Sequence, residues 1–296
     1  MRTRDFLLVV VAATLWGTGG VLGTLLADGG AVPAASVAMW RMVIAGGALT
    51  LWLGATQSLH LRTLTAPMWR RILATAGLVA VFEVLYFSSI ELAGVGLATL
   101  VAIGSAPAWV ASWDWWRHGD RPSRRGILAL LMALAGLAAL LGSSLDAGDR
   151  ALEGVALAIA TGVVFAGVTV VNRTPVGGLG APRLTALAFS VGGVMLAPAA
   201  VVLGWAVPAG TVPWIYAVAL GVAATALAYL AYLSGLRTVP PFVATVVALL
   251  EPLVAAALGA LLFAERIGPW ALLGGAALAS AVVLLRPQRD EPASLH

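Results

Sequence analysis

Three ionisable side chains lie within long apolar stretches of this chain: Arg41, Glu83 and Glu251. A charged group in hydrocarbon is costly, so membrane proteins that retain one generally use it for an ion pair, a substrate site or a proton path. Arginine binds carboxylates well, and a glutamate can hold an ammonium group or a proton. These three residues are therefore the first candidates for function, and the segments around them determine where they lie.

The composition of the 296-residue chain places those segments in a membrane. Hydrophobic residues make up 61% of the chain and charged residues 10%, with a mean hydropathy of +0.99. Soluble domains carry about 25% charged residues. We expect an all-α integral membrane protein, because helices satisfy their own backbone hydrogen bonds in lipid. Ten segments are long and apolar enough, or nearly so, to cross a bilayer: 6–26, 34–53, 72–90, 92–116, 126–142, 154–171, 184–207, 212–236, 239–263 and 268–285.

The distribution of charge predicts the orientation of these spans. The first span is long for a signal-peptide core, so we expect it to be retained. With the N-terminus inside, 14 of the 17 basic residues, all arginines, fall in cytoplasmic segments, and the outer loops carry mainly acids such as Asp146, Asp149 and Glu265. This asymmetry predicts a cell (inner) membrane protein with both termini in the cytoplasm.

Landmarks in the two halves recur at a constant spacing of 145 residues. Pro107 corresponds to Pro252, and the pair Asp120-Arg121 corresponds to Glu265-Arg266. Because five helices per half is an odd number, two such halves would have opposite topology, which is common in secondary transporters. We therefore expect two inverted five-helix repeats, residues 1–145 and 146–296. The alternative is that acid-arginine pairs simply recur in short turns.

Several stretches resemble one transporter family. They are LWGTGG at 15–20, WRMVIAGGAL at 40–49, the segment 86–107, and the segment 225–266, which contains GLR-x-VP, LEP and a final ER. On these motifs the chain resembles the EamA-type, ten-helix branch of the drug/metabolite transporter superfamily. The resemblance implies two five-helix repeats, a central cavity and export of metabolites, amino acids or drugs. SWDWWRHGDR at 112–121 departs from the family pattern of a small apolar run followed by GER.

The depth of the three charges suggests their roles. Arg41 and Glu83 each lie seven residues from the outer end of their span, about 10 Å below the outer surface. Equal depth permits a pair, acting either as a gate or substrate clamp, or as a static structural ion pair. Glu251 lies near mid-membrane before Pro252, which frees backbone carbonyls where transporters build binding sites. The alternative for Glu251 is a packing role through neighbouring polar groups.

Aromatic residues and prolines complete the set of candidates. We expect Pro107 to bend its helix as Pro252 does. Asp114 is expected to be an interfacial acid paired with Arg117 or Arg121. The expected cavity walls, which could instead be helix packing or an interfacial belt, are Trp16, Tyr86, Trp109, Tyr229 and Tyr232.

The function that these features favour is a secondary transporter exporting small solutes by alternating access. We expect no cofactor, metal or nucleic acid, and a monomer whose partners are a small-molecule substrate, protons and the bilayer. The alternatives are a gradient-independent facilitator and a non-transporting scaffold. An enzyme is not expected, because the chain has no cysteine, places its three histidines in loops or the tail, and has no GxSxG elbow. Without a P-loop, the energy would come from a gradient or from the substrate.

Overall fold

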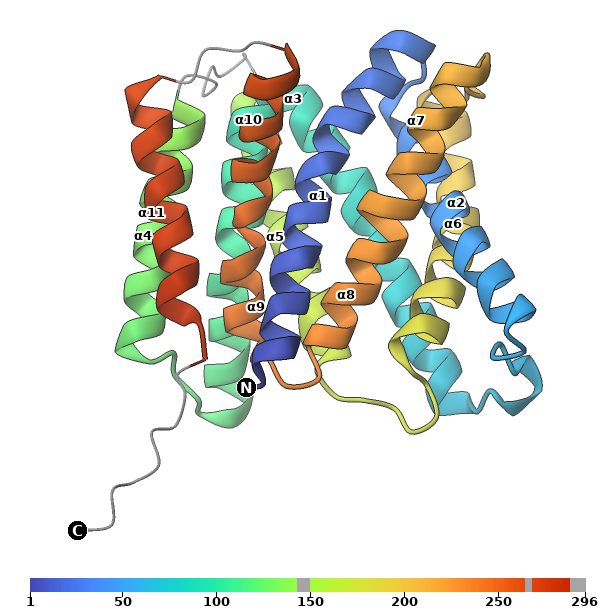
Figure 1. The fold of residues 1–296 in the computed structure, drawn as a ribbon, viewed down its shortest axis with the longest axis horizontal. Helices are drawn as coiled ribbons and strands as arrows, with labels where there is room; N and C mark the ends of the chain where they lie inside the picture. The colour runs from blue at the N-terminus through green and yellow to red at the C-terminus, as the bar shows by residue number, and fades with distance from the viewer. Residues whose placement is uncertain (143–149, 264–267, 288–296) are drawn as a thin grey trace.

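The protein is a bundle of upright helices (Figure 1). The computed structural model describes residues 1–142, 150–263 and 268–287. Asp146, Asp149, Glu265 and Arg266, which bear on the orientation and on the repeat, lie outside these residues, as does the boundary between the two expected halves. The helices are α1 (Thr3–Gly30), α2 (Ala34–Ala55), η1 (Leu61–Thr63), α3 (Ala66–His118), α4 (Arg124–Leu141), α5 (Ala151–Asn172), α6 (Ala181–Gly204), α7 (Thr211–Gly221), η3 (Val222–Leu227), α8 (Ala228–Gly235), α9 (Pro241–Ala248), α10 (Leu250–Phe263) and α11 (Pro269–Leu285).

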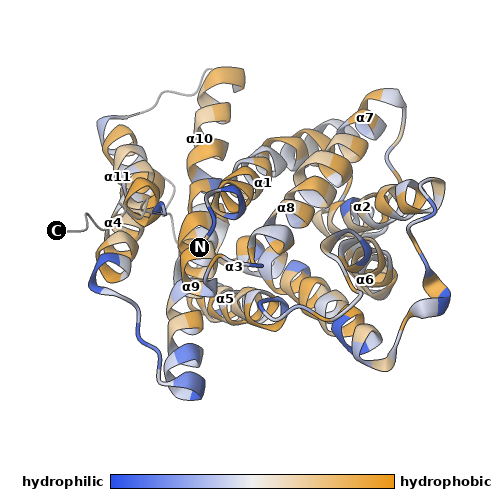
Figure 2. Cartoon of the chain, turned by 60° about the horizontal axis from the view of Figure 1, so that its bottom comes forward, coloured by the Kyte–Doolittle hydropathy of each residue, from blue (hydrophilic) through white to orange (hydrophobic). Residues whose placement is uncertain are grey.

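Eight helical segments within the described residues are long and apolar enough to cross a membrane, and α11 is a shorter apolar helix. The fold is therefore that of a multi-pass membrane protein. Large apolar side chains are exposed on the outside of the bundle, for example Val202, Leu152 and Leu261, and Figure 2 shows that the helices consist mainly of hydrophobic residues. Such a surface is stable only in contact with lipid.

The 53-residue helix α3 is divided at Gly94. A straight helix of that length would measure about 80 Å, far more than the ~30 Å of bilayer hydrocarbon. Gly94 has φ 76° and ψ 158°, a backbone conformation that requires glycine. It separates a first arm (residues 66–93) from a second arm (95–118). Pro107 lies inside the second arm, where the torsions stay helical, so the helix continues through this residue and the bend at Pro107 stays a prediction.

Two other helices change geometry at mid-length. A turn at Leu249 separates α9 from α10. Pro252 follows within the first turn of α10 and has no N–H to donate to the carbonyl of Ala248, so the helical ladder is interrupted there. Between α7 and α8 the chain forms the π-helix η3, which widens the turn around Thr225.

The helices pack in extensive pairs. α2 lies along α6, α4 along α11 and α3 along α5, while α1 contacts both α8 and α10. Glycines permit the closest approaches: a side chain at Gly136 or Gly274 would collide with the backbone of the partner helix.

One end of the bundle carries the N-terminus and the connections α2–α3, α3–α4, α5–α6 and α8–α9 (Figure 1). Hydrogen bonds join these segments: the backbone N of Arg2 donates to Thr238, Arg71 donates to the carbonyl of Thr174, and Arg183 donates to the carbonyl of His60. We call this end the arginine-rich face, because it carries Arg2, Arg4, Arg62, Arg70, Arg71, Arg117, Arg121, Arg124, Arg125, Arg173, Arg183, Arg237 and Arg286.

Candidate functional site

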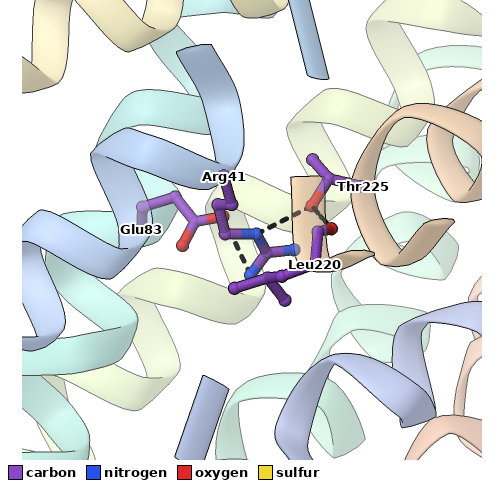
Figure 3. A network of polar contacts seen from close by, with 4 residues as sticks. All are labelled: Arg41, Glu83, Leu220 and Thr225. Carbon is purple, nitrogen blue, oxygen red and sulfur yellow. Dashed lines mark hydrogen bonds and ion pairs between the residues drawn. The ribbon is translucent and has the colours of Figure 1, made fainter. Parts of the chain in front are cut away.

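Arg41 of α2 and Glu83 of the first arm of α3 are in contact in the interior of the bundle (Figure 3). The distance from Nη1 of Arg41 to Oε1 of Glu83 is 3.5 Å. Glu83 is 1% exposed and Arg41 18% exposed, so the pair is largely shielded from solvent. The structure therefore confirms the contact that equal depth permits, whereas the role of the pair stays a prediction.

A second contact orients the arginine. Nε of Arg41 donates a hydrogen bond to Oγ1 of Thr225 at 3.0 Å, and that hydroxyl donates to the carbonyl of Leu220 at 2.9 Å (Figure 3). Because Thr225 and Leu220 are five residues apart, the bond follows the π-helical spacing of η3. The sequence offers no local signal for this contact, since one threonine in an apolar helix is unremarkable.

A cavity of about 310 Å³ lies beside this pair at the centre of the bundle. We call it the central cavity. It is lined by residues 16–27 of α1 and 34–41 of α2, and by Ile90 and Val95 of α3, so it faces the end opposite the arginine-rich face. A volume near 300 Å³ with apolar walls and a few polar groups is typical of a small-molecule site.

Six of the 19 residues that line the central cavity are aromatic. Of the predicted residues, Trp16, Tyr86, Tyr229, Arg41 and Glu251 line it. Phe82 and Phe165 also line it and were missed. Phe82 could have been found from the sequence, because it lies one helical turn before Tyr86 and shares its face. Phe165 stands in an apolar helix with no such signal.

Two polar groups of the central cavity lack partners in the described part of the chain. The half-buried Glu251 opens onto the central cavity and makes no hydrogen bond or ion pair with the described residues, which gives no support to the alternative that neighbouring groups satisfy it. Trp16 is only 6% exposed, and its buried indole Nε1 has no hydrogen-bond acceptor in the described part of the chain. A buried polar group without a partner costs about 1–3 kcal/mol. A bound solute could satisfy both groups.

An aromatic cluster closes the central cavity on the side of the arginine-rich face. The ring centroid of Trp16 lies 5.0 Å from that of Tyr232, 5.1 Å from Tyr229 and 5.9 Å from Phe165. We call these four residues the aromatic floor. Tyr232 is fully buried behind the cavity lining, and its hydroxyl is hydrogen-bonded to Thr169 at 2.7 Å. It therefore supports the cavity from behind and does not line it.

Two predictions at the arginine-rich end of α3 need correction. Trp109 is 40% exposed and does not line the central cavity, so it faces outward with Trp113 and Trp116. Asp114 is paired with an arginine as predicted, but the partner is Arg173 at the end of α5 and not the nearby Arg117 or Arg121, and Asp114 also contacts His118. The sequence could not predict this partner, because Arg173 lies 59 residues after Asp114 along the chain.

In the described part of the chain, apolar helices surround a cavity lined by Arg41 and Glu251, an arrangement typical of membrane transporters. The chain belongs to the EamA-like transporter family, whose model matches residues 4–142 and 152–286. It is 30% identical over 292 residues to "Uncharacterized transporter YwfM" of Bacillus subtilis (strain 168), covering 97% of this chain and 96% of that protein.

Two further comparisons agree with this assignment. An "Uncharacterized transporter" of Archaeoglobus fulgidus is 28% identical over 199 residues, covering 67% of this chain and 70% of the relative. A solved structure described only as "Crystal structure of protein" superposes with a TM-score of 0.81 at 20% identity, covering 96% of each chain. That likeness shows a shared fold.

Proposed function

We propose that this protein is a secondary transporter that exports small organic solutes, such as metabolites, amino acids or drug-like compounds, through the central cavity by alternating access. The observation that carries the proposal is the cavity itself. It lies at mid-bundle, has aromatic walls, and presents the unpartnered groups of Glu251 and Trp16. A scaffold would have no reason to keep unsatisfied polar groups in its interior.

Alternating access in this fold would follow from ten membrane crossings in two inverted repeats. The two arms of α3 count as two crossings, the segments 211–235 and 241–262 as one each, and α11 as the tenth. The helix pairing supports the repeat. The second helices of the two halves, α2 and α6, pack against each other, and so do the fifth helices, α4 and α11. First helices α1 and α5 each pack against the third and fourth crossings of the other half.

Two glycines extend the 145-residue spacing of the repeat. Gly17 of α1 and Gly162 of α5 are separated by 145 residues. A Cβ at Gly17 would lie 2.7 Å from the carbonyl oxygen of Glu251, and one at Gly162 would lie 2.7 Å from that of Ala102. Each glycine thus allows the first helix of one half to approach the fourth crossing of the other. This reciprocity favours the repeat over chance recurrence of acid-arginine pairs.

The charge distribution assigns the orientation. Basic residues are enriched on the cytoplasmic side of membrane proteins, so the arginine-rich face, where α1 begins and α11 ends, would be cytoplasmic in the cell membrane. The central cavity then faces the exterior, and the aromatic floor closes its cytoplasmic side. Export would require the floor to open and the outer side to close, exposing the same site to the cytoplasm. A single chain contains this whole path, so a monomer suffices.

The charges of the central cavity favour solutes with a basic nitrogen. Glu83 neutralises Arg41, which leaves the carboxylate of Glu251 without a counter-charge. An ammonium group near Glu251 would supply that charge, and aromatic or aliphatic parts would pack on Trp16, Phe82 and Phe165. A carboxylate on the same solute could reach Arg41.

A flux assay with a cavity-blocking variant tests the proposal. The full chain is reconstituted in liposomes, and the flux of leucine, phenylalanine and tryptamine is followed with and without a pH gradient. Gly23 and Gly47 both have open space where a Cβ would be added, but only Gly23 lines the central cavity. Gly23→Leu should abolish flux, whereas Gly47→Leu should retain it.

The outcome also decides between two transport modes. Flux that follows the gradient indicates a coupled exporter, and flux that ignores it indicates a facilitator. Equal flux through the Gly23→Leu and Gly47→Leu proteins would contradict transport through this cavity. If the folded wild-type protein transports none of these probes, the solute classes that they represent are excluded as substrates.

A further inference from the structure

A second cavity, of about 340 Å³, lies between α2, α3 and α6. We call it the side cavity. Ala34, Glu91 and Leu203 line it near the ends of their helices that lie opposite the arginine-rich face. Ala38, Glu83 and Leu196 line it further inside. The side cavity therefore runs from that end of the bundle down to Glu83.

Helical periodicity explains how α3 serves two cavities. Phe82, Tyr86 and Ile90 recur every four residues and line the central cavity. Val84, Ser88 and Glu91 lie on an adjacent strip of the same helix and line the side cavity. Glu83 lies between the two strips. It borders the side cavity, whereas Glu251 borders the central cavity. The two cavities are adjacent and share Ala34, Phe87 and Ile90, but each borders only one of the two carboxylates.

The two oxygens of the Glu83 carboxylate have different environments. Oε1 contacts Arg41, and Oε2 is buried with no hydrogen-bond partner among the described residues. An ionised oxygen in such a place is unsatisfied, and a proton on it would remove the charge. Ser88 and Glu91 are the polar side chains between Glu83 and the outer end of the side cavity. They are suited to hold water along that route.

The other ionisable groups near Glu83 are few. Arg41 of α2 contacts it directly, and Tyr86 of α3, Tyr229 of α8 and Glu251 of α10 are close enough to sense its charge. The helix α6 contributes only apolar residues to the side cavity within the described chain. Arg41 is therefore the one cation that balances Glu83 among the described residues, and it also lines the central cavity.

We infer that Glu83 is a proton-binding site, reached through the side cavity, and that it is separate from the solute site at Glu251. A proton entering past Glu91 and Ser88 forms an O–H bond at Oε2. The neutral carboxyl group no longer attracts Arg41 by charge, so the guanidinium can turn to Glu251, where it competes with the ammonium group of a solute. Loss of the proton restores the pair. This inference rests on the proposed transport function, because it makes Arg41 the link between proton and solute.

Infrared spectroscopy tests the proton site without any solute. The purified protein is titrated with acid in lipid, and the carbonyl band of protonated carboxyl groups is recorded for the wild type, Glu83→Gln, Glu251→Gln and Glu91→Gln. We expect that one titrating band of the wild type is absent from Glu83→Gln but is still present in Glu251→Gln and Glu91→Gln. Identical titrating bands in Glu83→Gln and the wild type would overturn the inference, even if no transported probe had been found.

A blocked side cavity tests the route. Ala199 of α6 lines the side cavity, so Ala199→Leu fills it, while Val201→Leu changes an exposed position on the same helix. With tryptamine and phenylalanine as probes, Ala199→Leu and Glu83→Gln should lose the stimulation of flux by a pH gradient. Ala199→Leu should keep the flux seen without a gradient, and Val201→Leu should behave as the wild type.

The results separate this inference from the proposed function. Full gradient stimulation in Glu83→Gln or in Ala199→Leu would refute the proton site or its route, respectively, while transport itself stands. If Gly23→Leu loses all flux while the side-cavity variants behave as the wild type, transport through the central cavity is supported and the proton route through the side cavity is refuted. Absence of flux in every protein would refute the transport proposal and leave the infrared titration to decide on Glu83.

Discussion

Removing Arg41 should destabilise the protein more than removing both members of its pair. At the 3.5 Å separation of Arg41 and Glu83, two unit charges attract by about 5 kcal/mol at an effective dielectric constant near 20. Removing one partner of a buried pair costs about 3–5 kcal/mol, because the other charge is left uncompensated. Since Arg41 is 18% exposed, we expect Arg41→Met to cost about 3 kcal/mol, near the lower limit.

Two companion variants separate the causes of that loss. The double variant Arg41→Met/Glu83→Gln leaves no buried charge at the pair, so it should recover most of the unfolding free energy. Thr225→Val removes only the hydrogen bond to Nε of Arg41 and should cost about 1 kcal/mol. The predicted order of stability is wild type, Thr225→Val, double variant and Arg41→Met.

Unfolding in lipid-detergent mixtures, followed by the fluorescence of the 11 tryptophans, measures these differences. Circular dichroism before unfolding verifies that each variant is folded. If Arg41→Met is at least as stable as the double variant, Glu83 carries no uncompensated charge in the folded state. The predicted cost of leaving Glu83 charged without Arg41 would then be wrong.

Three further variants test packing, the solute site and the arginine-rich face. In α2, Gly46→Ala should destabilise the protein by about 1–3 kcal/mol, because the added Cβ would collide with Ser190 of α6. Gly47→Ala is the control: its Cβ would meet open space, so it should be neutral or slightly stabilising in the same unfolding assay. Glu251→Gln should leave stability nearly unchanged but reduce tryptamine flux at least about tenfold, since a hydrogen bond to a charged group contributes about 1.5–3 kcal/mol; unchanged flux would place the ammonium elsewhere. Asp114→Asn should cost no more than about 1 kcal/mol, because its ion pair is partly exposed, and a larger loss on unfolding would show that the pair is more than superficial.

The residues at the ends and breaks of helices were the most predictable from sequence. A run of apolar residues long enough to span a bilayer forms a helix whatever surrounds it, so the spans were predicted closely. Pro252 interrupts its helix for a reason contained in its own ring. The equal depth of Arg41 and Glu83 follows from counting residues along two helices, and the structure confirms their contact.

Tertiary packing decided which way each side chain faces. Hydrophobic periodicity identifies the inner side of a helix only when the outer side is polar. These helices are apolar on nearly every side, because lipid replaces water outside, so the pattern does not predict their rotation. For this reason Trp109 was expected in the cavity but faces outward, and Phe165 was missed.

The sequence determines a lipid-embedded bundle of helices, the depth of its three interior charges and the concentration of arginine at one end, since each depends on composition and distance along the chain. Only the three-dimensional packing brings Thr225 against Arg41, leaves Glu251 without a partner in the described chain, and places Glu83 on the side cavity instead of the central cavity. Those contacts join helices far apart in sequence, and they depend on how each helix is rotated against its neighbours.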